Sequence, residues 1–144
     1  MTPDLLFQLC NSIAPLGWLL MIVAPQWRWT KTIVLSGLLP LLLGLVYLTL
    51  IIVFFGEGEG DFSSLKGVML LFTSPWGVTA GWIHYLAFDM FIGSWELRNG
   101  QQHGMPHYLI VPCLLLTFLF GPIGLLLFYL LRATKTKKFI HENF

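Results

Sequence analysis

Charged residues are scarce in this 144-residue chain, and their scarcity limits what kind of protein it is. Only 10% of the residues are charged, whereas a soluble domain carries roughly a quarter. With 56% hydrophobic residues, the chain has more apolar surface than a soluble core of this size absorbs. The surplus must face lipid, so the composition predicts a membrane protein. The net charge of +1 provides no basic surface for a nucleic acid.

Cysteine is also sparse. Cys10 and Cys113 each lie in an apolar run, and the sequence has no Cys-x-x-Cys pair. We interpret both thiols as buried structural residues and expect no metal or redox site.

The chain also lacks the basic segment of a removable signal peptide and the Arg- and Ser-rich composition of a transit peptide. These features favour an integral protein of a bacterial inner or thylakoid membrane, or of a chloroplast membrane if the source is a plastid lineage.

Long hydrophobic runs are what the chain does have. Four runs approach the ~20 residues that a helix needs to cross a bilayer. They cover about residues 5–24, 33–55, 77–95 and 107–131, and a basic tail follows at 132–144. Prolines within three runs predict kinks, and the small residues beside them allow close helix packing. The expected fold is all-α: a single membrane domain, 1–144, in which four kinked transmembrane helices form one bundle.

The positive-inside rule predicts the orientation of such a bundle. With four crossings, five lysine and arginine residues lie on the side of the termini and three lie on the other side. The five are Lys66, Arg132, Lys135, Lys137 and Lys138, and the three are Arg28, Lys31 and Arg98. The count favours both termini and the acidic loop Glu57–Asp61 on the cytoplasmic side.

Two ionisable residues lie inside the third run, within Gly81-Trp-Ile-His-Tyr-Leu-Ala-Phe-Asp-Met-Phe91. Such groups are costly at membrane depth unless they are paired or hydrated, so His84 and Asp89 are functional-site candidates. Helical periodicity places them about 140° apart, which excludes a direct pair. The functional interpretation is an acid or base in a dry pocket. The alternative is an interhelical hydrogen bond, for example between Asp89 and Tyr47 or Asn11.

The polar stretch from Glu96 to His107 has two interpretations. One is a solvated, salt-bridged loop with a turn at Asn99-Gly100, and the other is the rim of a ligand entry site. His107 opens the fourth run at a depth roughly 16 Å from that of His84, which argues against a shared metal or haem. Aromatic residues are concentrated in the second half of the chain and suit either a long conjugated ligand or lipid.

Several motifs along the chain match a known family. They are Val23-Ala24-Pro25, Thr30-Lys31, Pro40, Leu43-Gly44-Leu45-Val46-Tyr47, Trp82-Ile83-His84, Asp89-Met90-Phe91, Asn99-Gly100, His107, Cys113 and Pro122-Ile123-Gly124. With these motifs the chain resembles the abscisic-acid-deficient-4-like membrane proteins, whose plant members are associated with neoxanthin synthesis. The resemblance covers nearly the whole chain. One departure is Arg98-Asn99-Gly100, where the plant sequences carry Asn-Asp-Gly.

The resemblance implies a cofactor-free isomerase that opens one epoxide of an epoxy-carotenoid to an allenic alcohol. We assign the acid and base roles of this chemistry to Asp89 and His84. Residues predicted to contact the substrate are Trp82, Tyr85, Phe88 and His107. If the source is a bacterium such as a cyanobacterium, the substrate is expected to be whichever xanthophyll that organism makes.

A non-catalytic role is the alternative: a carotenoid-binding membrane protein or an assembly subunit of a pigment complex. In both interpretations the expected partners are membrane lipid and a carotenoid or other apolar ligand, and no nucleic acid is expected. The sequence leaves assembly into a homo-oligomer open.

Overall fold

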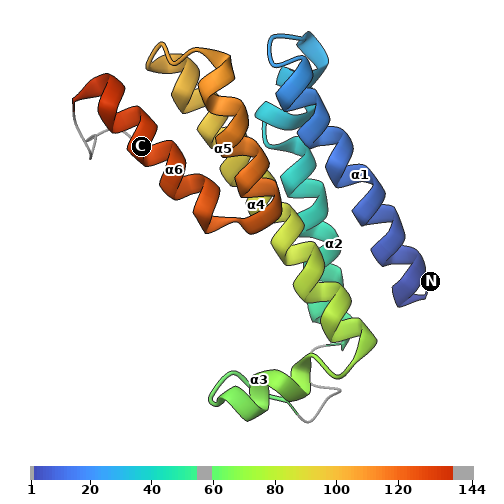
Figure 1. Ribbon diagram of the computed structural model, residues 1–144. Coiled ribbons are helices and arrows are strands. Elements are labelled where there is room, and N and C mark those ends of the chain that lie inside the picture. The colour runs from blue at the N-terminus through green and yellow to red at the C-terminus, as the bar shows by residue number, and fades with distance from the viewer. Residues whose placement is uncertain (1, 55–59, 138–144) are drawn as a thin grey trace. The chain divides into compact units, whose positions relative to one another are not determined.

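The computed structural model describes residues 2–54 and 60–137. Within these residues it contains seven helices and no strand, which confirms the all-α class. In chain order they are α1 (Pro3–Val23), the π-helix η1 (Thr30–Leu35), α2 (Leu38–Phe54), α3 (Leu65–Leu71), α4 (Pro75–Gln102), α5 (His107–Phe120) and α6 (Pro122–Thr136), shown in Figure 1. Glu57 and Glu59 of the predicted acidic loop, and the tail from Lys138 onward, lie outside the described residues.

The first two hydrophobic runs form α1, η1 and α2. By length and composition, α1 is the one described helix that is long and apolar enough to cross a membrane, whereas α2 and α5 are apolar but shorter. α1 ends at Val23, next to Ala24, whose helical conformation is disfavoured by the following Pro25. The second run is divided between η1 and α2 at Gly37, whose φ of +88° interrupts a right-handed helix.

α3 is a short helix of seven residues between the second and third hydrophobic runs. The Ser64 hydroxyl caps its N-terminus by accepting a hydrogen bond from the Gly67 N–H at 3.0 Å. Just before it, Ser63 donates its N–H and its hydroxyl to Asp61 Oδ1 at 2.7 and 2.6 Å. These hydrogen bonds lower the pKa of the exposed Asp61 carboxyl, because they stabilise its charged form.

α4 is longer than the run predicted at 77–95, because it has 28 residues and continues to Gln102. The expected turn at Asn99-Gly100 is therefore wrong, since both residues are helical. Gly100 packs so closely against Ile110 and Phe128 that a side chain there would meet them. The packing of Gly100 explains the glycine, which the sequence alone suggested as a turn residue.

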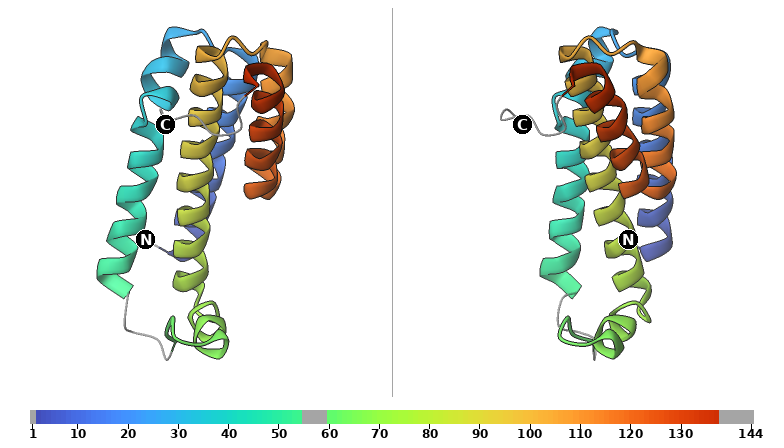
Figure 2. Two further views of the ribbon diagram at one scale, coloured as in Figure 1. Left: turned by 90° about the vertical axis from the view of Figure 1, so that its left-hand side faces the viewer. Right: turned by 60° about the vertical axis from the view of Figure 1, so that its left-hand side comes forward.

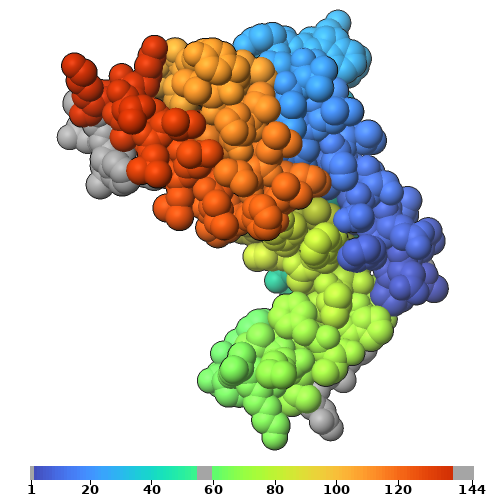
Figure 3. Space-filling view, viewed as in Figure 1, coloured from blue at the N-terminus to red at the C-terminus, as the bar shows by residue number. Residues whose placement is uncertain are grey.

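The fourth run, 107–131, consists of α5 and α6 instead of one continuous helix. The break is at Gly121, whose φ is +50°, and Pro122 has no N–H with which to continue the α5 hydrogen bonds. α5 and α6 fold back on each other as an antiparallel hairpin, which the views of Figure 2 show, and their surfaces adjoin in Figure 3. They approach closely at Gly124, where a side chain would collide with Thr117.

The contacts divide the chain into two compact units. Unit 1 takes Met1–Pro15 and Leu39–Phe88, and unit 2 takes Leu16–Leu38 and Asp89–Phe144. Each unit contains one of the cysteines, and both thiols are free and buried, as expected from the sequence. The boundary within α4 falls between Phe88 and Asp89, so His84 and Asp89 belong to different units.

Candidate functional site

Glu96 is the most unusual residue of unit 2, because its carboxyl group has no exposed surface. It lies on α4, and the hydroxyl oxygen of Thr117 on α5 is 2.9 and 3.0 Å from its two carboxyl oxygens. A hydroxyl has one hydrogen to donate, so it serves one of these oxygens at a time. Burying a carboxyl group with so little hydrogen bonding is unfavourable, which makes Glu96 a functional-site candidate.

Asp89 lies seven residues before Glu96 and on the same face of α4, about 10 Å away along the helix axis. Side chains of a helix lean toward its N-terminus, so the longer Glu96 side chain reaches back toward Asp89. On the hairpin, a Cβ on Gly121 would lie 3.3 and 3.4 Å from the two Asp89 carboxyl oxygens. Thr117 and Gly121 are roughly one helical turn apart, so Glu96 and Asp89 face neighbouring positions of the hairpin. We refer to the face of α4 that carries these two residues as the carboxyl stripe of α4. The two carboxyl groups interact electrostatically.

A buried arginine lies beyond Glu96 in the same unit. Arg132 on α6 is 3% exposed and donates from Nη1 to the Asn99 side-chain oxygen at 2.9 Å. Its guanidinium carbon lies 4.6 Å from the centre of the Tyr129 ring and 5.8 Å from those of Trp95 and Phe128. Its Nε is buried and has no hydrogen-bond partner in the described part of the chain. Unit 2 therefore buries a cation between α6 and α4, in addition to the Glu96 carboxyl group.

His107 has a defined tautomer. Its Nε2 lies 2.8 Å from the carbonyl oxygen of Ile22, and because a carbonyl only accepts, Nε2 must carry the hydrogen. In the neutral ring, Nδ1 is then an acceptor, and it is buried without a partner among the described residues. A ligand hydroxyl is the kind of group that such a nitrogen accepts from.

The other predicted site residues lie in unit 1. The His84 ring is exposed, 5.2 Å from the Tyr47 ring and 4.7 Å from the Phe88 ring. Trp82 donates its indole N–H to the Asn11 side chain at 3.0 Å and lies 5.2 Å from the ring of Tyr85. Tyr47 and Asn11, which the sequence suggested as partners for Asp89, thus contact His84 and Trp82.

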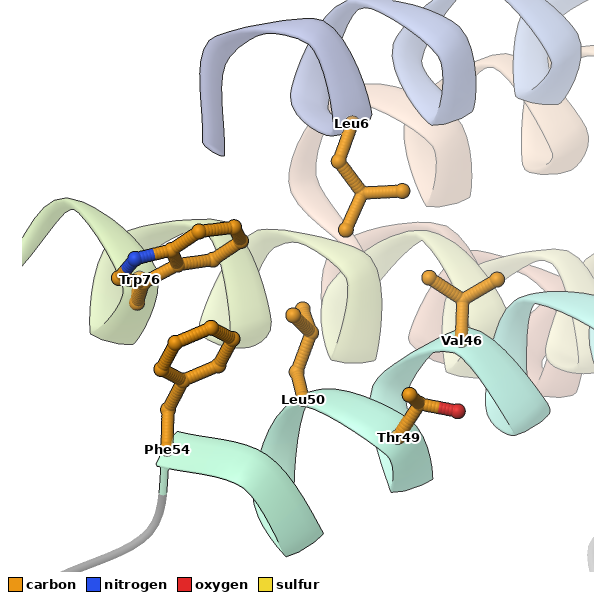
Figure 4. Close-up of a pocket in the computed structure, with 6 residues that line it drawn as sticks. All are labelled: Leu6, Val46, Thr49, Leu50, Phe54 and Trp76. Carbon is orange, nitrogen blue, oxygen red and sulfur yellow. The ribbon is translucent and has the colours of Figure 1, made fainter. Parts of the chain in front are cut away.

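Unit 1 also contains an apolar cavity of about 360 Å³, drawn in Figure 4. Phe54 and Trp76 stack on one side of it with ring centres 4.1 Å apart and planes at 13°. The lining residues are Leu6, Val46, Thr49, Leu50, Phe54 and Trp76. None of these six is ionisable, so the cavity is suited to holding an apolar group and not to acid or base chemistry.

Sequence reasoning missed Glu96, Thr117 and Arg132 as site residues. It placed Glu96 in a solvated loop, whereas the residue is helical and fully buried. The spacing of seven residues from Asp89 indicates that the two residues share one helix face, but it does not indicate that Glu96 is buried. No comparable signal existed for Thr117 or Arg132, since their role depends on the hairpin. Among the described residues, no group of three or more His, Cys, Asp or Glu side chains is arranged to hold a metal ion.

The fold and the site define an all-helical protein with two interacting carboxyl groups packed against a helical hairpin, and α1 among its described helices is long and apolar enough to cross a membrane. The chain belongs to the ABA4-like family, described as ABA DEFICIENT 4-like, whose model matches residues 5–128. Membership of this family confirms the resemblance found in the sequence and indicates a role related to carotenoids. No curated protein and no solved structure matches the chain.

Proposed function

We propose that this protein is a cofactor-free isomerase of carotenoid metabolism that opens the epoxide of an epoxy-carotenoid to an allenic alcohol. Family membership supports the class of substrate. The observation that supports catalysis is the pair of carboxyl groups, Asp89 and Glu96, on one face of α4. Burial of acids at a helix contact is unfavourable, and proton transfer is the function that such groups perform.

The proposed reaction needs one proton donor and one proton acceptor. The donor protonates the epoxide oxygen while the bond from this oxygen to the carbon next to the polyene chain breaks. The acceptor removes the hydrogen of the adjoining chain carbon, and the electron pair left behind forms the second double bond of the allene. No electrons are gained or lost. After each turnover, one proton must return from the acceptor to the donor. Two neighbouring carboxyl groups can exchange such a proton.

Asp89 fills one of these roles in the proposal, and either Glu96 or His84 fills the other. Glu96 is favoured because it lies on the same face of α4 as Asp89 and because the Thr117 hydroxyl orients its carboxyl group. His84 remains the alternative, with its ring exposed beside Tyr47. Comparing Glu96→Gln with His84→Gln decides between them, because the variant that lacks the second proton-transfer group loses product formation.

We further propose that four residues contact the substrate. The aromatic side chains of Trp82, Tyr85 and Phe88 offer flat surfaces to a conjugated chain. His107 offers its Nδ1 to a hydroxyl group on the end ring of a xanthophyll.

The substitution Asp89→Asn tests the proposal, because asparagine keeps the shape of the side chain but does not exchange a proton at neutral pH. In cells supplied with an epoxy-carotenoid, product formation is expected to fall about 10²- to 10⁴-fold. Asp61→Asn, which changes an exposed carboxylate in the same way, is the matched control and is expected to stay active. Full activity in Asp89→Asn would remove Asp89 from the chemistry.

A second candidate function is non-catalytic: the binding of a carotenoid, or a role as an assembly subunit of a pigment complex. The unit 1 cavity favours it, since its lining is apolar and carries no ionisable group. In that case the carotenoid copurifies with the protein unchanged. Asp89→Asn then lowers the free energy of unfolding by about 0.6–2 kcal/mol, as expected for a lost interhelical hydrogen bond, without changing the pigment.

A further inference from the structure

The helices of the hairpin are too short to cross a membrane. With 14 residues in α5 and 15 in α6, they extend about 21 and 22 Å, whereas the hydrocarbon core of a bilayer is about 30 Å thick. Because α6 runs back along α5, a chain that enters the bilayer through α5 leaves through α6 on the same side. At the turn, Gly121 is buried in protein, as irregular backbone at membrane depth must be, and the exposed residues beside it, Phe120 and Ile123, are apolar.

Two hydrogen bonds join helix ends of unit 2 in two pairs. His107 at the start of α5 bonds to the carbonyl of Ile22 near the end of α1 at 2.8 Å. Arg132 near the end of α6 bonds to Asn99 near the end of α4 at 2.9 Å. We refer to these helix ends, together with residues 24–37 and 103–106, as the basic end of unit 2.

The exposed charge at the basic end is positive. Its exposed basic residues are Arg28, Lys31, Arg98, Lys135 and Lys137, whereas Arg132 is buried, and Lys138 follows in the sequence. The described acidic residues of unit 2 are Asp89 and Glu96, and neither is exposed. Trp27, Trp29 and Tyr108 are exposed in the same part of the chain, as aromatic residues are at a membrane interface.

We propose that α5 and α6 form a re-entrant hairpin and that the basic end of unit 2 lies on the cytoplasmic side, in contact with anionic lipid headgroups. Three helices then cross the membrane: α1, α4 with its 28 residues, and α2, whose 17 residues are at the lower limit of the range that spans a bilayer. The N-terminus then lies on the opposite side. This arrangement places seven of the eight lysine and arginine residues on one side, and Lys66 alone on the other. A division of seven to one satisfies the positive-inside rule far better than the five to three of four crossings.

Anionic headgroups are the partner that fits this surface. The cytoplasmic leaflet carries the anionic lipids of a membrane, and they attract lysine and arginine residues near its surface. Arg28 lies 5.2 Å from the centre of the exposed Trp29 ring, so a cation and an interfacial aromatic residue are held together. This inference concerns orientation and lipid contact and does not depend on the proposed isomerase activity.

Labelling of single cysteines tests the orientation. The parent chain is the control, since its two native thiols are buried. The exposed positions Gln26, Ser63 and Thr134 are each changed to cysteine and treated with a membrane-impermeant maleimide in intact and in lysed bacterial cells. We expect Ser63→Cys to react in intact cells, and Gln26→Cys and Thr134→Cys to react only after lysis. If Thr134→Cys and Ser63→Cys are labelled under the same condition and Gln26→Cys under the other, the chain crosses the membrane four times and the proposal is wrong.

Lipid selectivity tests the contact. The purified protein is exchanged into a mixture of phosphatidylglycerol and phosphatidylcholine, and the lipids that remain bound are measured by mass spectrometry. We expect enrichment of phosphatidylglycerol in the parent and in Lys66→Gln, and loss of that enrichment when Arg98, Lys135 and Lys137 are all changed to glutamine. Equal enrichment in all three proteins, or none in the parent, would contradict the headgroup contact.

Discussion

Glu96 and Asp61 show at the residue scale how surroundings decide what a carboxyl group does. Asp61 is exposed and takes two hydrogen bonds from Ser63, so it is a stable surface anion. Glu96 is fully buried and is served by one hydroxyl, that of Thr117. A carboxyl group in the second setting lacks the hydrogen bonds that would fix it as an anion, which suits proton transfer.

The Thr117 hydroxyl is expected to contribute measurably to stability. Thr117→Val keeps the shape of the side chain but leaves Glu96 buried without this donor, which should lower the free energy of unfolding by about 1–3 kcal/mol. Thr49→Val is the matched control, because Thr49 is exposed and its hydroxyl bonds to the Leu45 carbonyl of its own helix. Thermal unfolding in detergent measures both. Equal midpoints for the two variants would show that the Thr117 hydroxyl does not support Glu96.

Arg132 is expected to resist replacement even by lysine. The planar guanidinium contacts three aromatic rings and bonds to Asn99, and lysine reproduces the charge without the planar contact. Arg132→Lys should lower the free energy of unfolding by about 2 kcal/mol, the size of a desolvated cation–π contact. Arg98→Lys, on the exposed side of α4, should change it little. Unfolding curves of the two variants that coincide would contradict this account of Arg132.

At the scale of elements, the hairpin of α5 and α6 organises the site, because it carries both Thr117 and Gly121 to the carboxyl stripe of α4. Its two helices meet at Gly124, where the backbone and side chain of Thr117 leave no room for a Cβ. Only glycine therefore allows the two helices to pack this closely. Because Thr117 lies at this contact, glycine at position 124 also keeps Thr117 in place beside Glu96.

Gly124→Ala is expected to push the hairpin helices apart. Overpacking of this kind lowers the free energy of unfolding by about 1–3 kcal/mol, and the shift of Thr117 should also slow product formation. Gly44→Ala is the control, because a Cβ on Gly44 meets nothing within 4 Å and alanine favours a helix. Unfolding and pigment conversion are measured for both. A Gly124→Ala protein as stable and active as Gly44→Ala would mean that the helices do not meet as described.

Sequence patterns predicted most helices but not how they combine. Apolar runs located α1, α2 and the centre of α4, because burial in lipid or in a core selects such residues. The fourth run was expected to be one helix, although Gly121-Pro122 supplies a break, since proline is tolerated within membrane helices and its effect depends on neighbours. Asp89 was found because a charge in an apolar run is conspicuous, whereas Glu96 was hidden by its polar sequence neighbours.

At the scale of the whole molecule, the chain places different chemistry in its two units. Unit 1 contains the apolar cavity and the aromatic contacts of His84 and Trp82. Unit 2 contains the two carboxyl groups, the buried Arg132 and the basic end. The non-catalytic alternative rests on the chemistry of unit 1, and the proposed isomerase rests on the carboxyl groups of unit 2.

The most direct test of the central claim is pigment conversion by the purified protein alone. The full chain is reconstituted into liposomes that contain an epoxy-carotenoid, with no added cofactor, and the products are separated and identified over time. We expect an allenic alcohol from the parent protein and a loss of about 10²-fold or more for two variants: Asp89→Asn, and whichever of Glu96→Gln and His84→Gln lacks the second proton-transfer group. Unchanged pigment with the folded parent protein, or full conversion by both variants, would contradict the claim.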